Sequence, residues 1–226
     1  MALGSRLVLE ESMYRIGYID DEANQYGKFQ KKLERRYKDV ELVLLDDCKT
    51  KAEFVNKIYE KQIEVLLVDY KMAGSFGYNG STLINYINDQ IRDLECFILT
   101  AVDQGSIKDG LIAKRNIRSK EIFDTEGDDE QRVKNLNEFV EILKESADVF
   151  RTRREQKRIE YLELLEKRKS SGLSLQEEQE YLRLYRVLAS YGMIEKLPDI
   201  VLTTKFDQDL KELLEVGETI LKRHKE

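Results

Sequence analysis

The sequence predicts an α/β protein with a doubly wound, five-stranded parallel sheet, followed by an all-α C-terminal region. Short apolar runs alternate with stretches of helical spacing as far as about residue 150, which is the order expected of βαβ units. The run Val65–Val68 is uninterrupted and rich in branched side chains, as expected of a central strand buried on both faces. Beyond residue 150 only helical spacing follows, which predicts the all-α region.

Each apolar run indicates one strand, and each intervening stretch carries an apolar face at helical spacing. The expected strands are Tyr14–Ile19, Val40–Leu45, Val65–Val68, Cys96–Leu99 and Leu111–Ala113. The expected helices cover residues 24–37, 50–62 and 81–92, and an unbroken helix runs from 130 to about 169.

The C-terminal region is predicted to be entirely helical. Ser170–Gly172 is a turn, and Ser174 with Glu177 has the spacing of a capping box that opens the next helix. A last amphipathic helix is expected at Phe206–Leu221. The predicted organisation is therefore a disordered or non-native N-terminus at 1–12, an α/β domain at 13–149 and a helical domain at 150–226.

Composition narrows the class of partner and the compartment. A formal net charge of -6 argues against a general nucleic-acid binder and against binding to anionic membranes. No apolar segment is long enough to span a membrane, so none is expected. Cys48 and Cys96 lie far apart without metal-type spacing, which favours a reducing cytoplasm.

Polar side chains follow three of the predicted strands. Asp20 and Asp21 follow the first strand, Asp69 the third and Thr100 the fourth. In a parallel sheet all carboxyl ends meet at one edge, where open α/β sheets bind ligands. Clustered carboxylates repel one another unless a cation neutralises them, and an all-oxygen site suits Mg²⁺, which often bridges to a phosphoryl group. Thr100 can then donate to a phosphoryl oxygen, and a nearby lysine would balance the charge.

These motifs, in this order and spacing, resemble the receiver domain of bacterial response regulators, a flavodoxin-like fold, over roughly residues 14–150. The matching segments are Ile19–Glu22, Val65–Asp69 with Met72, Gly80 followed by Leu83, Ile84 and Ile87, and Phe97–Ala101. The resemblance implies that Asp69 is the phosphoacceptor and that Asp20 and Asp21 hold Mg²⁺. It further implies that the Lys71 backbone carbonyl is a metal ligand and that Thr100 is the switch hydroxyl.

The family also has a lysine at the end of its fifth strand, and two residues compete for this role. Lys114 ends the apolar run Leu111–Ala113, whereas Lys120 has the usual separation from Thr100. Because Ile117–Ser119 is a poor buried strand, we favour Lys114, with Lys120 as the alternative. The family's lysine is usually followed by proline, and neither candidate is. The loop between Asp69 and Gly80 is also longer than usual in the family.

The resemblance implies a response regulator that accepts a phosphoryl group from a histidine kinase or phosphotransfer protein. Such a chain catalyses only its own phosphorylation and dephosphorylation. The helical region is expected to bind an effector protein or to form a homodimer, with nucleic acid an unlikely partner, and the chain could act as a phosphate sink. The alternatives are a transcription regulator with an atypical DNA-binding domain and a pseudo-receiver scaffold that is never phosphorylated.

Overall fold

The computed structural model describes residues 13–21, 25–101, 107, 110–124, 129–196, 212–213 and 215–216. Its contacts divide the chain into two compact units, Met1–Glu155 and Gln156–Glu226. The expected N-terminal segment, residues 1–12, lies outside the described residues, as does most of the expected helix Phe206–Leu221. Residues 212, 213, 215 and 216 are helical.

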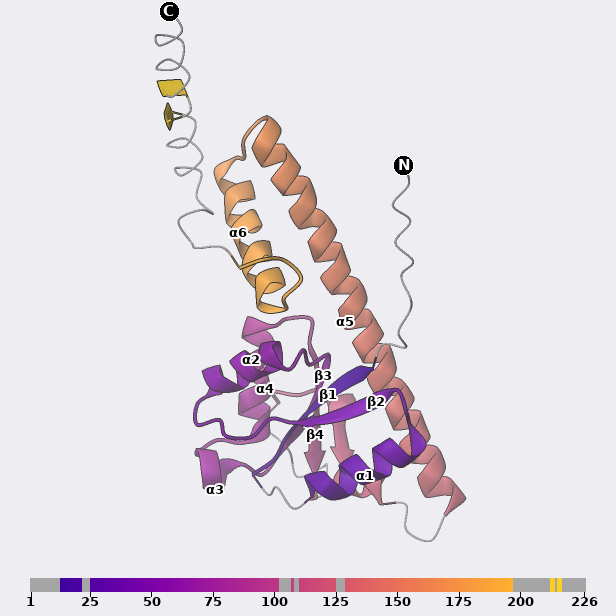
Figure 1. Cartoon of the computed structure of the whole chain (residues 1–226). Helices are drawn as coiled ribbons and strands as arrows, with labels where there is room; N and C mark the ends of the chain where they lie inside the picture. Colours follow the sequence, from indigo (N-terminus) through magenta and orange to yellow (C-terminus); the bar gives the residue numbers. More distant parts are fainter. Residues whose placement is uncertain are drawn as a thin grey trace, which may run out of the picture. The chain divides into compact units, whose positions relative to one another are not determined.

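Strands and helices alternate through the first unit, as expected (Figure 1). The strands are β1 (Tyr14–Ile19), β2 (Val40–Leu44), β3 (Val65–Asp69), β4 (Glu95–Thr100) and β5 (Ile117–Ser119). The α-helices are α1 (Tyr26–Arg36), α2 (Lys51–Glu60), α3 (Ala73–Phe76), α4 (Gly80–Gln90), α5 (Glu130–Ser170) and α6 (Leu175–Ser190). Two short 3-10 helices, η2 (Lys114–Asn116) and η3 (Lys120–Phe123), flank β5.

The five strands form one sheet in the order β2-β1-β3-β4-β5, and every neighbouring pair is parallel. This confirms the predicted doubly wound sheet. The strand β3 lies at its centre, and all five of its residues are buried, because right-handed crossovers place helices over both faces.

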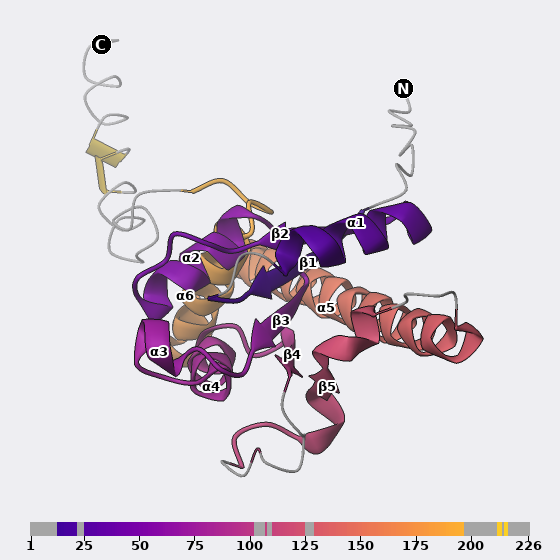
Figure 2. The same ribbon diagram turned by 90° about the horizontal axis from the view of Figure 1, so that it is seen from below.

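One face of the sheet is covered by α1 and the first half of α5, and α2, α3 and α4 lie on the other side (Figure 2). The first half of α5 buries an apolar stripe against the first of these faces. The core on this face contains Ile16, Tyr18, Phe29, Leu33, Val65, Leu67, Phe97, Leu99, Phe123, Leu136, Phe139, Val140, Leu143 and Ala147. The long helix α5 is unbroken from Glu130 to Ser170, as predicted.

The position of the fifth strand differs from the prediction. Leu111 is 45% exposed, and the strand is Ile117–Ser119, which pairs in parallel with Ile98–Thr100. Only Ile117 of its three residues is buried. Because β5 is a short edge strand, backbone hydrogen bonds to β4 hold it without an apolar run. The Asn116 side chain adds a hydrogen bond to the Cys96 carbonyl at 3.2 Å.

The second unit contains the end of α5 and the helix α6. Ser174 caps α6 and forms the predicted capping box with Glu177. A small core joins the two helices, and it contains Tyr161, Tyr181, Leu184, Tyr185, Leu188 and Ala189. Among the described helices of the whole chain, none has the length and apolar character that a membrane span requires.

Candidate functional site

The register of the sheet brings the polar strand ends to the same level. Ile19 pairs with Val68, so Asp20 and Asp69 are the next residues on adjacent strands. Asp69 pairs with Leu99, which places Thr100 one residue beyond it on β4. The carboxyl edge of the sheet therefore collects side chains from β1, β3 and β4, as the sequence predicts.

Asp20, Asp21 and Asp69 form a carboxylate cluster at this edge. One carboxylate oxygen from each lies within 4.8 Å of the other two. The Asp20 side chain is 0% exposed and the Asp69 side chain 6%. Three carboxylates so close together repel one another, and an all-oxygen donor set of this kind fits Mg²⁺.

Lys120 supplies the positive charge of the cluster. Its ammonium Nζ lies 2.8 Å from Asp20 Oδ2 and 2.9 Å from Asp69 Oδ1. Burial lowers the pKa of Lys120, but hydrogen bonds to Asp20 and Asp69 outweigh that effect and leave the pKa raised. Burial raises the pKa of Asp69 above its ordinary value, and Lys120 only partly offsets this. The site therefore has a fixed cation beside one carboxylate whose ionisation is disfavoured.

The lysine preferred from the sequence is not the one at the cluster. Lys114 lies exposed in η2, before β5 begins, whereas Lys120 follows β5 directly and starts η3. The preference for Lys114 is therefore corrected to Lys120. The buried-strand criterion failed because β5 buries a single residue.

Local contacts fix the short helix that carries Lys120. The Ser119 hydroxyl accepts a hydrogen bond from the Glu121 backbone N–H at 3.2 Å and so caps η3. At the other end, the Lys32 ammonium on α1 donates to the Phe123 carbonyl at 2.8 Å. These contacts position the backbone from which Lys120 reaches the carboxylates.

Two hydroxyl groups that the sequence analysis did not identify hold the acidic pair. The Tyr18 phenol donates a hydrogen bond to Asp20 Oδ2, and the Ser75 hydroxyl donates to Asp21 Oδ2 at 2.8 Å. Side chains alternate along a strand, so Tyr18 and Asp20 share one face, and that spacing could have revealed Tyr18. Ser75 lies on α3, and no sequence pattern links it to Asp21.

The remaining expected residues lie on or next to β3 and β4. Thr100 ends β4 and is 1% exposed. Lys71 is exposed and lies in the turn between β3 and α3, two residues after Asp69. Gly80 opens α4 directly against β3, since a Cβ at that position would lie 2.0 Å from the Asp69 carbonyl oxygen. The close approach of α4 to Asp69 therefore requires glycine.

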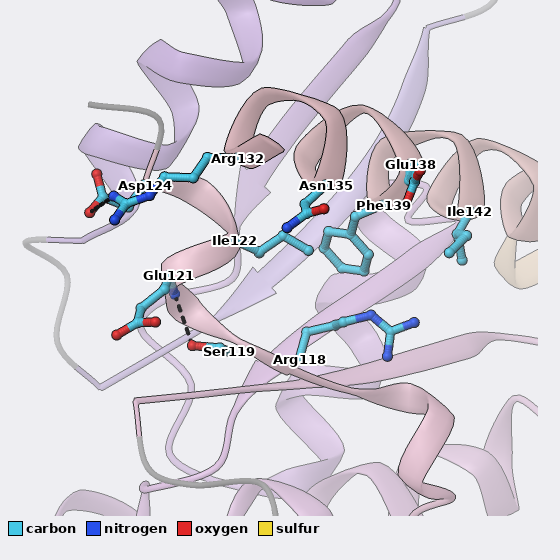
Figure 3. A pocket seen from close by; sticks show the side chains of 10 residues that line it. All are labelled: Arg118, Ser119, Glu121, Ile122, Asp124, Arg132, Asn135, Glu138, Phe139 and Ile142. Atoms are coloured by element: carbon cyan, nitrogen blue, oxygen red, sulfur yellow. Dashed lines mark hydrogen bonds and ion pairs between the residues drawn. The ribbon is translucent and has the colours of Figure 1, made fainter. Parts of the chain in front are cut away.

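A separate pocket of about 510 Å³ lies between the β5–η3 segment and the first half of α5 (Figure 3). None of the expected site residues lines it. Arg118 enters from β5, and its guanidinium lies 5.7 Å from the centroid of the Phe139 ring. The other lining residues are Ser119, Glu121, Ile122, Asp124, Arg132, Asn135, Glu138 and Ile142.

Comparisons with known proteins give structural matches only. No family model matches the sequence, and no curated protein matches it. A CheY-like response regulator receiver domain from Methanospirillum hungatei JF-1 is 18% identical, with 61% of this chain and 98% of that chain covered and a TM-score of 0.43. The RcsB response regulator of Salmonella typhimurium is 18% identical, with 85% and 96% covered and a TM-score of 0.45.

The comparisons also correct one expectation. RcsB from Salmonella enterica serovar Typhimurium, solved bound to the promoter rprA, is 20% identical, with 84% of this chain and 96% of that chain covered and a TM-score of 0.42. Other similar structures are an RcsB–DNA complex and two RcsB dimers bound to two parallel DNAs. The expectation that nucleic acid is an unlikely partner conflicts with these findings and is wrong.

The order of the strands identifies the fold. A parallel sheet of order β2-β1-β3-β4-β5 with helices on both faces is the flavodoxin-like arrangement. The carboxylates of Asp20, Asp21 and Asp69 lie at the carboxyl edge, on the strands next to the point where the strand order reverses. The chain therefore has a flavodoxin-like fold, followed by a helical region.

Proposed function

We propose that this chain is a response regulator that accepts a phosphoryl group on Asp69 in the presence of Mg²⁺. The observation that carries the proposal is the cluster of Asp20, Asp21 and Asp69 with Lys120 in hydrogen-bond contact with two of the three. In this assignment Asp20, Asp21, Asp69 and the Lys71 backbone carbonyl hold the ion. When bound, Mg²⁺ supplies positive charge that neutralises the phosphoryl oxygens.

The proposed reaction is phosphoryl transfer from a phosphohistidine of a kinase or phosphotransfer protein. An Asp69 carboxylate oxygen forms a bond to phosphorus while the phosphorus–nitrogen bond of the donor breaks, and the electron pair of that bond leaves on the imidazole nitrogen. Lys120 keeps the Asp69 carboxylate in place and offsets the charge of the incoming group. The chain thus catalyses only its own phosphorylation and dephosphorylation, mostly by positioning and charge neutralisation.

Thr100 is assigned the response to phosphorylation. An acyl phosphate adds about two negative charges and strong hydrogen-bond acceptors next to the end of β4. In this proposal the Thr100 hydroxyl moves to donate to the new phosphoryl oxygens. Its movement biases the protein between two arrangements.

Labelling with radioactive acetyl phosphate tests the proposal. The wild-type chain should be labelled in Mg²⁺ and not in EDTA, and Asp69→Asn should abolish labelling. Asp46→Asn is a matched control, because Asp46 follows β2 at the same edge of the sheet but is 59% exposed and pairs with Lys57 instead. Undiminished labelling of Asp69→Asn, or equal labelling in Mg²⁺ and in EDTA, would exclude Asp69 as the Mg²⁺-dependent phosphoacceptor.

DNA binding is the second candidate function, as the output of the helical region. Several of the similar structures are RcsB assemblies with DNA, and this observation is the reason to test DNA binding. A gel-shift experiment with promoter-containing duplexes should give a complex that weakens steeply as salt rises, since phosphate contacts release counterions. No complex at low salt, with or without acetyl phosphate, would exclude this candidate.

A further inference from the structure

We propose that Tyr18 is a positioning residue of the cation site, acting through Asp20, and that it strengthens Mg²⁺ binding. The inference rests on the proposed function, because it assigns a partner to one of the proposed metal ligands. It goes beyond that function by naming a buried phenol, in the middle of the core, that prepares the site before any ion binds.

The phenol of Tyr18 and the ammonium of Lys120 reach the same oxygen of Asp20. Both donate to Oδ2, Tyr18 from the strand that carries Asp20 and Lys120 from the far edge of the sheet. The Asp20 and Tyr18 side chains are 0% exposed. Because the two donors come from different elements, they fix the orientation of the Asp20 carboxylate. Asp20 therefore keeps one orientation relative to Asp21 and Asp69.

Aromatic neighbours hold the ring of Tyr18 in place. Tyr26 on α1 stacks on it with ring centroids 6.2 Å apart, and Phe29 packs edge-on at 5.8 Å. A ring fixed on two sides has little rotamer freedom left to lose, so its hydroxyl group is already aimed at Asp20. The donor is therefore preorganised, which is what a ligand-orienting residue requires.

A neutral donor is suited to this position. Asp20 lies in a site that already contains two other carboxylates. A hydrogen bond from Tyr18 orients the Asp20 carboxylate without adding a second cation, which would compete with Mg²⁺. Losing an orienting partner of a metal ligand typically weakens metal affinity about 10- to 100-fold.

The decisive comparison is between Tyr18→Phe and Tyr26→Phe. Both variants remove one phenol oxygen from the same aromatic cluster, but the Tyr26 hydroxyl donates to the Leu42 carbonyl at 3.0 Å and not to a carboxylate. Isothermal titration of the full chain with Mg²⁺ should show a Kd raised about tenfold in Tyr18→Phe and unchanged in Tyr26→Phe. Circular dichroism and urea unfolding in EDTA establish that each variant is folded.

A second measurement uses the unaltered chain. The hydroxyl proton of Tyr18, protected by burial and hydrogen-bonded to a carboxylate, should give a downfield NMR resonance that shifts when Mg²⁺ is added. A titration of Mn²⁺ followed by electron paramagnetic resonance should rank the affinities of the variants in the same order. These readouts do not depend on phosphoryl transfer.

The outcomes separate this inference from the proposed function. If the wild-type chain does not bind Mg²⁺, the proposed function is wrong. If the wild-type chain binds Mg²⁺ but Tyr18→Phe binds it equally or more tightly, the positioning role is wrong and the proposed function stands. An equal loss in Tyr26→Phe would also overturn the inference, since it would show a general effect of the aromatic core.

Discussion

The ammonium of Lys120 lies 2.9 Å from the carboxylate of Asp69, and it reaches this residue from the far edge strand of the sheet. It also contacts Asp20 at 2.8 Å. One side chain at the end of β5 therefore links the ends of β1 and β3. The pairing of Ser119 with Thr100 places Lys120 next to the end of β4.

Replacing Lys120 should slow phosphorylation far more than replacing Lys114. Lys120→Met removes the cation that touches Asp69, and losing one charge-stabilising donor in a water-poor site costs about 10² in rate. Lys114→Met removes an exposed lysine of η2 and should leave the rate unchanged. The initial rate of labelling by acetyl phosphate at saturating Mg²⁺ provides the measurement. A larger loss in Lys114→Met would restore the sequence-based preference.

The two lysines show what an apolar pattern can and cannot predict. The strands β1, β3 and β4 are buried on both faces, so apolar runs in the sequence predict their positions. The polar residues that follow these runs then predict the site. The strand β5 lies at an edge and buries only Ile117, so its hydrogen bonds to β4 are made by backbone groups that any sequence supplies. An apolar run is therefore a poor guide to β5, while the spacing from Thr100 indicated the lysine that lies at the carboxylate cluster.

Contacts made by hydroxyl groups were missed for a different reason. The bond from Tyr18 to Asp20 depends on a ring fixed by Tyr26 and Phe29 from another element. The bond from Ser75 to Asp21 depends on where α3 lies after β3. Both follow from tertiary packing, and only the strand alternation that puts Tyr18 beside Asp20 was available in the sequence.

A methyl group at Gly80 should disturb Asp69. In Gly80→Ala the new Cβ would lie 2.0 Å from the Asp69 carbonyl oxygen, so α4 or the end of β3 must shift, which destabilises the fold by about 1–3 kcal/mol. Urea unfolding measures the loss, and labelling by acetyl phosphate should fall with it. Gly74→Ala in α3 is the control, because no atom lies within 4 Å of its Cβ position. Equal stability of the two variants would contradict the prediction.

Asp69 should make the metal-free protein less stable as pH rises. Burial raises its pKa in the folded state, so the favourable contribution of the protonated acid is complete below the ordinary pKa of 3.8 and is lost as pH rises through the folded value. In EDTA, Asp69→Asn should therefore be more stable than wild type at neutral pH, and the difference should shrink on acidification. Urea unfolding across this pH range measures it.

The exposed residue Asp46 again provides the control for this effect. Its side chain is 59% exposed, so Asp46→Asn should show no comparable gain at neutral pH. Added Mg²⁺ should reverse the order of the wild type and Asp69→Asn, because the ion binds the carboxylate and stabilises only the chain that keeps it. If Asp69→Asn is less stable than wild type at neutral pH in EDTA, the predicted burial of an unfavourable charge is wrong.

An ion pair at the opposite edge of the sheet should contribute to stability without affecting the site. Glu64 precedes β3 and is 6% exposed, and Arg151 of α5 contacts its two oxygens at 2.6 and 2.7 Å. Arg151 also donates to the Met13 carbonyl at 3.0 Å. The pair therefore connects α5 to the amino ends of β1 and β3, at the edge of the sheet opposite to the one where Asp69 lies.

Removing only the Glu64 charge should leave Arg151 with Asp148 alone as an anionic partner, at the longer distance of 3.8 Å. We expect Glu64→Gln to lower the free energy of unfolding by about 3 kcal/mol, and we expect Glu64→Gln with Arg151→Met to recover part of that loss. Glu41→Gln is the control, since Glu41 and Arg15 form an ion pair whose side chains are 44% and 43% exposed, worth less than about 1 kcal/mol. Urea unfolding gives all three values.

Because the pair lies far from the carboxylate cluster along the strands, the rate of labelling should stay unchanged in conditions where Glu64→Gln is folded. A slower rate in the folded variant would show instead that the two edges of the sheet are energetically coupled.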